Sequence, residues 1–251
     1  MKTQEKNFDG IKLSGFTAIL IMLALTGTAI YLLSLPQTPS IIAGVICGIC
    51  VVVMLPGFMI IQPNNSRVLT FFGRYAGTVI SNGFYWVNPL FLKSTVTLRI
   101  LNLNIDPIKV NDKVGNPIMI GAVVVWRIKD TYKASFDISG NIREFVQIQS
   151  DAALRQVAGM YAYDTNETID KVTLRSDESG EITQRLEDEL NSRLAIAGIE
   201  IVEARINYLA YASEIASVML RRQQADAIIS ARERIVEGAV SMVHLALEKL
   251  E

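Results

Sequence analysis

Charged side chains are absent from one long part of this chain. None of the 49 residues from Leu13 to Ile61 is Asp, Glu, Lys or Arg, although the whole chain has 24 basic and 25 acidic residues. All of the charge lies in the other 202 residues, where about a quarter of the side chains are charged, as is usual for soluble domains. The sequence therefore predicts a membrane anchor joined to a soluble body.

Cysteine and histidine are also scarce. The two cysteines, Cys47 and Cys50, lie inside the uncharged stretch, and His244 is the single histidine. This scarcity excludes a disulfide framework for the soluble part and any site built from several imidazoles. Cys47 and Cys50 have the CxxC spacing of redox and metal sites, but no second pair accompanies them, so we interpret them as small apolar residues of one helix. The net charge of -1 gives no electrostatic footprint for nucleic acid.

We therefore expect a protein that is not an enzyme, with no catalytic, cofactor-binding or metal-binding residues. The chain has no phosphate-binding loop, no Gly-x-Ser-x-Gly elbow and no HExxH motif. A membrane-bound thiol or hydrolytic enzyme is the least favoured alternative.

The uncharged stretch divides at the turn-like residues 36–40 into apolar segments 13–35 and 41–61. Each segment is long enough to cross a hydrocarbon core of about 30 Å as a helix. Basic residues flank the pair and spare the linker: Lys2, Lys6, Lys12, Arg67 and Arg74. The positive-inside rule then places both termini and the soluble body in the cytoplasm, in a bacterial inner membrane or its equivalent. The linker is either exposed on the opposite side or buried as the tip of a re-entrant hairpin.

After the anchor, the hydrophobic period first indicates strands and then helices. Alternation predicts strands over 66–73, 95–110 and 117–128, and a later one over 199–208. Helical periodicity predicts helices over 130–138, 142–161 and 180–197, and a long one from 213 onward. Strands followed by segregated helices are typical of an α+β fold with an antiparallel sheet. The expected organisation is a cytoplasmic N-terminus (1–12), an anchor (13–61), a folded body (62–212) and a terminal helix (213–251).

A short aromatic segment follows the anchor by about 20 residues. Aromatic and apolar side chains of this density are typical of the membrane interface, although burial in a sheet would explain them too. The residues predicted to contact the interface are Phe84, Tyr85, Trp86, Phe91 and Leu92.

The terminal helix has two apolar seams at seven-residue spacing. One seam is Ile229, Val236 and Val243, and its neighbour is Ile228, Ile235 and Met242. A two-stranded coiled coil needs one narrow seam, whereas two seams suit a helix with a neighbour on each side, as in a ring or cylinder. The alternative is a helix that folds back on its own domain. The six seam residues are the candidate oligomerisation site.

Several segments in a fixed order resemble the SPFH (Band 7) family, which includes stomatins, prohibitins, flotillins and the bacterial regulators of a membrane-bound protease. They are residues 61–68 leading into Phe71-Phe72-Gly73-Arg74, then 82–89, 95–103, 110–134, 150–155 and 190–205. No single motif is specific for this family, but the order and spacing of the segments over about 150 residues are specific for it.

The resemblance implies a homo-oligomeric membrane scaffold, with or without a paralogue in the ring. Such a ring would organise a membrane microdomain, its lipids and its resident proteins. The alternative is a dedicated regulator that encloses one membrane protease, channel or transporter. No cofactor is expected.

Overall fold

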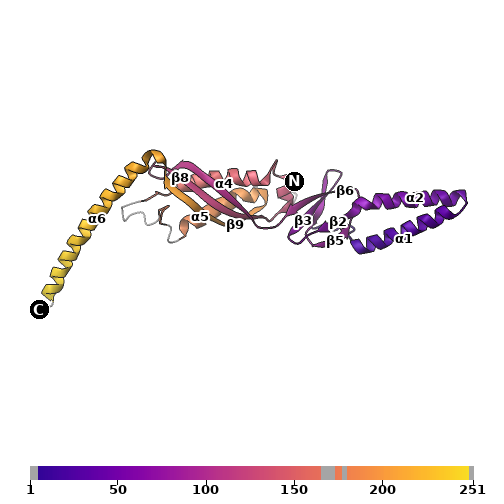
Figure 1. The fold of residues 1–251 in the computed structure, drawn as a ribbon, viewed down its shortest axis with the longest axis horizontal. Helices are drawn as coiled ribbons and strands as arrows, with labels where there is room; N and C mark the ends of the chain where they lie inside the picture. Colours follow the sequence, from indigo (N-terminus) through magenta and orange to yellow (C-terminus); the bar gives the residue numbers. More distant parts are fainter. Residues whose placement is uncertain (1–4, 165–172, 177–179, 249–251) are drawn as a thin grey trace. The chain divides into compact units, whose positions relative to one another are not determined.

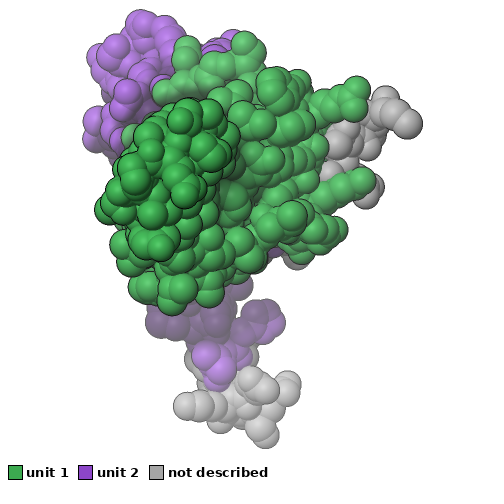
Figure 2. Space-filling view, turned by 90° about the vertical axis from the view of Figure 1, so that its right-hand side faces the viewer, with its two compact units in different colours: residues 1–102, 125–146, 191–202 green, residues 103–124, 147–190, 203–251 purple. Residues whose placement is uncertain are grey.

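The computed structural model describes residues 5–164, 173–176 and 180–248, so the ends of the expected segments 1–12 and 213–251 lie outside the described residues. The chain forms two compact units (Figure 2). The first comprises residues 1–102, 125–146 and 191–202, and the second residues 103–124, 147–190 and 203–251. The chain therefore passes several times from one unit to the other.

The first unit begins with a helical hairpin. Its helices α1 (Gly15–Ser34) and α2 (Thr38–Met54) lie side by side (Figure 1), and the segments Gly15–Ser34 and Thr38–Gly57 are each long and apolar enough to cross a membrane. Gly44 of α2 approaches α1 closely, since a Cβ there would meet the Leu33 side chain and the carbonyl oxygen of Ala29. Small residues at such contacts are how membrane helices pack without a hydrophobic driving force.

The second apolar segment differs from the expected 41–61. Helix α2 starts earlier, with Pro39 in its first turn, and ends at Met54. A single 3-10 turn, η1 (Leu55–Gly57), follows, and Phe58–Ile61 forms strand β2. The change occurs at Pro56, which has no N–H to continue the helical hydrogen bonds.

Two three-stranded sheets complete the core of the first unit. One has the order β1-β5-β2, where β1 is Leu13–Ser14 and β5 is Gly83–Trp86. The other has the order β4-β3-β6, with β3 at Asn65–Phe71, β4 at Arg74–Val79 and β6 at Phe91–Thr97. Their buried side chains form one cluster: Met59, Ile61, Leu69, Val79 and Val87.

The third sheet has the order β7-β8-β9, formed by Leu101–Asn111, Pro117–Ile128 and Ile199–Tyr211. The strand expected over 95–110 is therefore two strands, β6 and β7, because the chain turns at residues 98–100. Apolar and polar residues continue to mix through this turn, and no glycine or proline marks it in the sequence.

The remaining elements are helices, which confirms the α+β fold. They are α3 (Thr131–Phe136), α4 (Ile142–Ala158), α5 (Glu181–Leu194), the 3-10 turn η2 (Ala195–Ala197) and the long α6 (Ser213–Glu248). Gly198 ends the α5–η2 segment with a φ of 68°, the left-handed conformation that glycine adopts without strain.

Candidate functional site

Strand β5 joins the two ends of the helical hairpin. Leu13, just before α1, and Phe58, just after α2, are both register partners of Trp86, one on each side of the strand. The N-terminal residues pack nearby, because the N–H of Phe8 donates to the carbonyl oxygen of Thr78 at 3.0 Å. Both chain segments that enter and leave the hairpin therefore belong to one folded unit.

Specific contacts fix the base of this hairpin. The indole N–H of Trp86 donates to the carbonyl oxygen of Met54 at 2.9 Å, at the last turn of α2. The Lys93 ammonium donates to the carbonyl oxygens of Pro56 and, at 3.3 Å, Phe58. The bonds to Met54 and Pro56 satisfy carbonyl oxygens that the end of a helix leaves without partners. Gly57 is required here, because a Cβ would overlap the Trp86 ring and the carbonyl oxygen of Val87.

The surroundings of Lys93 also change its pKa. Burial lowers the pKa of the Lys93 ammonium, and the nearby Arg67 guanidinium lowers it further. Both effects disfavour the charged form of the lysine.

The five aromatic and apolar residues predicted to contact the membrane interface occupy different surroundings. Phe84 is half-buried, with its ring centroid 5.6 Å from that of Phe16 and 5.6 Å from that of Phe58. Tyr85 and Trp86 are also half-buried, and the Lys12 ammonium lies 4.7 Å from the centroid of the Tyr85 ring. These three residues meet at the base of the hairpin.

The other two predicted interface residues lie on β6. The Phe91 ring contacts that of Phe8, with 5.4 Å between centroids, and is half-buried. Leu92 is 69% exposed. Two exposed apolar side chains are not among the five predicted residues: Leu90 of the same aromatic segment, at 57%, and Phe72, at 77%. Phe72 stands directly before a glycine at a hairpin turn, which is the signal that could have identified it.

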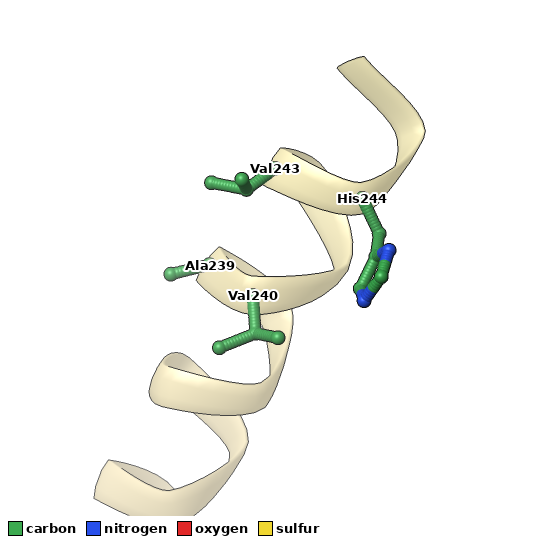
Figure 3. Close-up of a pocket in the computed structure, with 4 residues that line it drawn as sticks. All are labelled: Ala239, Val240, Val243 and His244. Atoms are coloured by element: carbon green, nitrogen blue, oxygen red, sulfur yellow. The ribbon is translucent and has the colours of Figure 1, made fainter. Parts of the chain in front are cut away.

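Helix α6 carries the six seam residues, and all of them are exposed, by 54% to 71%. Every residue from 227 to 245 is exposed. Figure 3 shows part of this surface, where Val243 lies one turn beyond Ala239 and His244 one turn beyond Val240. A single helix lines this patch, so its side chains are open to a neighbour.

The start of α6 is tied to the second unit by polar contacts. Glu214 accepts a hydrogen bond from the Lys109 ammonium at 2.5 Å, which lowers the pKa of the Glu214 carboxyl. Further along the helix, the Gln223 amide donates to the Asp164 carboxylate at 3.3 Å. These contacts fix the first turns of the helix.

Few groups in the described residues suggest chemistry. No group of three or more His, Cys, Asp or Glu residues lies together there in a way that could hold a metal ion. Cys47 is half-buried and Cys50 exposed, both on α2.

The comparisons point to one family. The model of the SPFH domain / Band 7 family matches residues 59–239, from β2 to the second half of α6. No curated protein matches the chain.

Proposed function

The chain belongs to the SPFH domain / Band 7 family, whose members are generally non-enzymatic, membrane-associated scaffolds, and we propose that it acts as an oligomeric scaffold of the stomatin and prohibitin type. Copies assemble side by side through α6, and their hairpins enclose a patch of bilayer with its resident proteins. Enclosure changes the lipid surroundings of those proteins and the access of other molecules to them. The proteins that such an enclosure would regulate are membrane proteases, channels or transporters.

The exposed apolar surface of α6 carries this proposal. The helix is 36 residues long, and its side chains from 227 to 245 have no cover within the described chain. Burial of one large apolar side chain contributes about 1.5–3 kcal/mol. Because a long helix with so much exposed apolar surface gains stability from neighbours, copies of the same chain are the natural cover.

The placement of the two seams favours a ring over a dimer. Residues seven apart on a helix face one direction, so Val236 and Ile235 belong to two adjacent stripes about 100° apart. A partner on each stripe gives every copy two neighbours, and such head-to-tail contacts close into a ring when the rotation permits. The run Gly238–Leu247 has no charged residue, which suits a surface that becomes buried.

The strand pairing at the hairpin base supports placing the folded body and the N-terminus on the same side of the membrane. Since β1 and β2 pair with the same strand, the chain enters and leaves the anchor at one membrane face. The basic flanks favour the cytoplasmic face, of a bacterial inner membrane or its equivalent. This geometry fits a spanning hairpin and a re-entrant one equally.

A charge placed in either seam tests the assembly. Val236→Asp and Ile235→Asp each put a carboxylate into one proposed interface, where an unpaired charge costs several kcal/mol. Ser241→Asp is the matched control, because it adds the same charge to the same helix away from both seams.

Size measurement and crosslinking of the full chain in mild detergent provide the result. Either seam variant is expected to break the closed assembly, while Ser241→Asp keeps it. Assemblies of unchanged size in both seam variants would contradict the proposal.

A further inference from the structure

The part of the chain around the anchor contains no acidic residue over a long distance. Between Asp9 and Asp106 there is neither Asp nor Glu. Five basic residues lie in this interval: Lys12, Arg67, Arg74, Lys93 and Arg99. None of them forms an ion pair with any described residue. The local surface is therefore positive without internal neutralisation.

The direction of β3 places one end of its sheet on the side of the two candidate spans. Strand β2 leaves the anchor, and a turn with a 3.1 Å hydrogen bond from the Asn65 N–H to the carbonyl oxygen of Gln62 reverses the chain. Leu69 on β3 is paired with Lys93, whose ammonium reaches Phe58 at the start of β2. The middle of β3 is thus level with the residues that follow the second candidate span.

Beyond Leu69 the strand runs away from the Gln62–Asn65 turn, in the direction of the candidate spans. Phe71 and Phe72 extend this end by two to three residues, or roughly 7–10 Å at about 3.3 Å per residue. Phe72 is exposed, as are Leu90 and Leu92 on the neighbouring segment, so the tip is apolar. Such a tip fits the boundary between head groups and acyl chains, which peripheral apolar faces enter by about 5–10 Å.

Arg74 lies beside this apolar tip, and Lys12 lies beside the hairpin base. Arg74 is exposed and pairs with Phe71 across the hairpin turn. Lys12 precedes α1, and its ammonium has neutral partners, the Tyr85 ring and the Ser81 hydroxyl at 3.2 Å. Arg99 lies at the opposite end, since it follows Thr97, the partner of Asn65 at the distant turn.

We propose that Lys12 and Arg74 form a collar that binds the phosphate groups of anionic phospholipids in the surrounding bilayer, while the Lys93 ammonium stays bonded to the carbonyl oxygens of Pro56 and Phe58. The lipid is favoured over an acidic protein because apolar side chains and two candidate spans adjoin the collar. The proposal goes beyond assembly, because each copy would select its own lipids whether or not a ring closes.

Trp86 provides a reporter at the collar. Its indole binds the end of α2, and the second tryptophan, Trp126, is buried with no hydrogen-bond partner for its indole N–H in the described structure. In the full chain with Trp126→Phe, the fluorescence of Trp86 is measured in phosphatidylcholine vesicles that contain a minor fraction of brominated lipid. The brominated lipid is phosphatidylglycerol in one series and phosphatidylcholine in the other.

Brominated phosphatidylglycerol is expected to quench Trp86 more strongly than brominated phosphatidylcholine at the same mole fraction. Lys12→Gln with Arg74→Gln should lower this preference by about five-fold per removed cation, equivalent to ~1 kcal/mol each. Arg99→Gln is the matched control and should leave the preference unchanged. Vesicles of fully brominated phosphatidylcholine show whether each variant still places Trp86 at the bilayer.

Three results would overturn the proposal. They are equal quenching by both lipids in the parent protein, an equal loss of preference in Arg99→Gln, and an unchanged preference in the double variant. None of them depends on oligomer size, so failure here is distinct from failure of the assembly proposal.

Discussion

Replacement of Asp112 by Ala tests how the second unit holds the start of α6. Asp112 is only 5% exposed, and one of its carboxylate oxygens accepts hydrogen bonds from the N–H groups of Val114 at 3.0 Å and Asn116 at 2.7 Å. The other oxygen accepts from the Asn116 amide and the Tyr163 N–H, each at 3.1 Å. The Tyr163 ring in turn contacts that of Tyr211 in a tilted arrangement, with 4.0 Å between centroids, two residues before α6 begins.

The expected loss of stability follows from these four hydrogen bonds. A hydrogen bond to a charged group contributes about 1.5–3 kcal/mol, and bonds that share one carboxylate are not additive. We therefore expect Asp112→Ala to lower the free energy of unfolding by about 3–5 kcal/mol, or roughly 6–20 °C in Tm. Asp112→Asn keeps one acceptor oxygen but presents an amide to the remaining donors, so we expect about half of this loss.

Thermal unfolding of the full chain in detergent, followed by tryptophan fluorescence, measures the effect. Asp137→Ala removes an exposed carboxylate of the same type and serves as the control. A Tm for Asp112→Ala within about 2 °C of this control would refute the reasoning, because 1 kcal/mol corresponds to about 2–4 °C for a chain of this size.

Three further predictions concern the first unit. Hydrogen bonds from Lys129 and then Arg127, both at 2.7 Å, lower the pKa of the Glu200 carboxyl below its usual 4.5. The ionised Glu200 therefore stabilises the fold fully above pH 4.5, and this stabilisation is lost as the pH falls through the lowered pKa. Glu200→Gln should lower Tm by a few degrees at neutral pH, worth ~1 kcal/mol or less for groups so exposed, and this difference in Tm should shrink as the pH falls through the lowered pKa of Glu200; a difference that stays constant through an acid titration would contradict the assignment. At the hairpin base, Trp86→Phe should cost about 1–2 kcal/mol through the lost bond to Met54. Gly57→Ala should cost more, because its Cβ meets backbone at Val87, and a parent-like Tm for this variant would count against the packing.

Periodicity predicted most elements because their apolar patterns are long and regular. Strand β8 has the bounds 117–128 that alternation indicated, and α6 starts at Ser213 as expected. The end of α2 was harder to predict, since Phe58–Ile61 is as apolar as the helix before it and its pairing with β5 is a non-local contact. Composition alone does not distinguish a membrane helix from a buried strand over so few residues.

The candidate sites were predictable to different degrees. The seams of α6 depend on spacing within one helix, so the sequence locates them directly. The surroundings of Phe84 depend on which segments meet at the hairpin base, and the sequence carries no local signal for that. The pairing of residues before α1 with the sheet after α2 was likewise missed, because it joins segments about 70 residues apart.

The central claim is a closed assembly of many copies built through α6. Electron microscopy of the full chain, extracted in mild detergent and imaged as single particles, tests it most directly. The account predicts closed rings or cages with the α6 helices side by side in the wall. A uniform population of monomers, at concentrations where the membrane anchor stays folded, would contradict it.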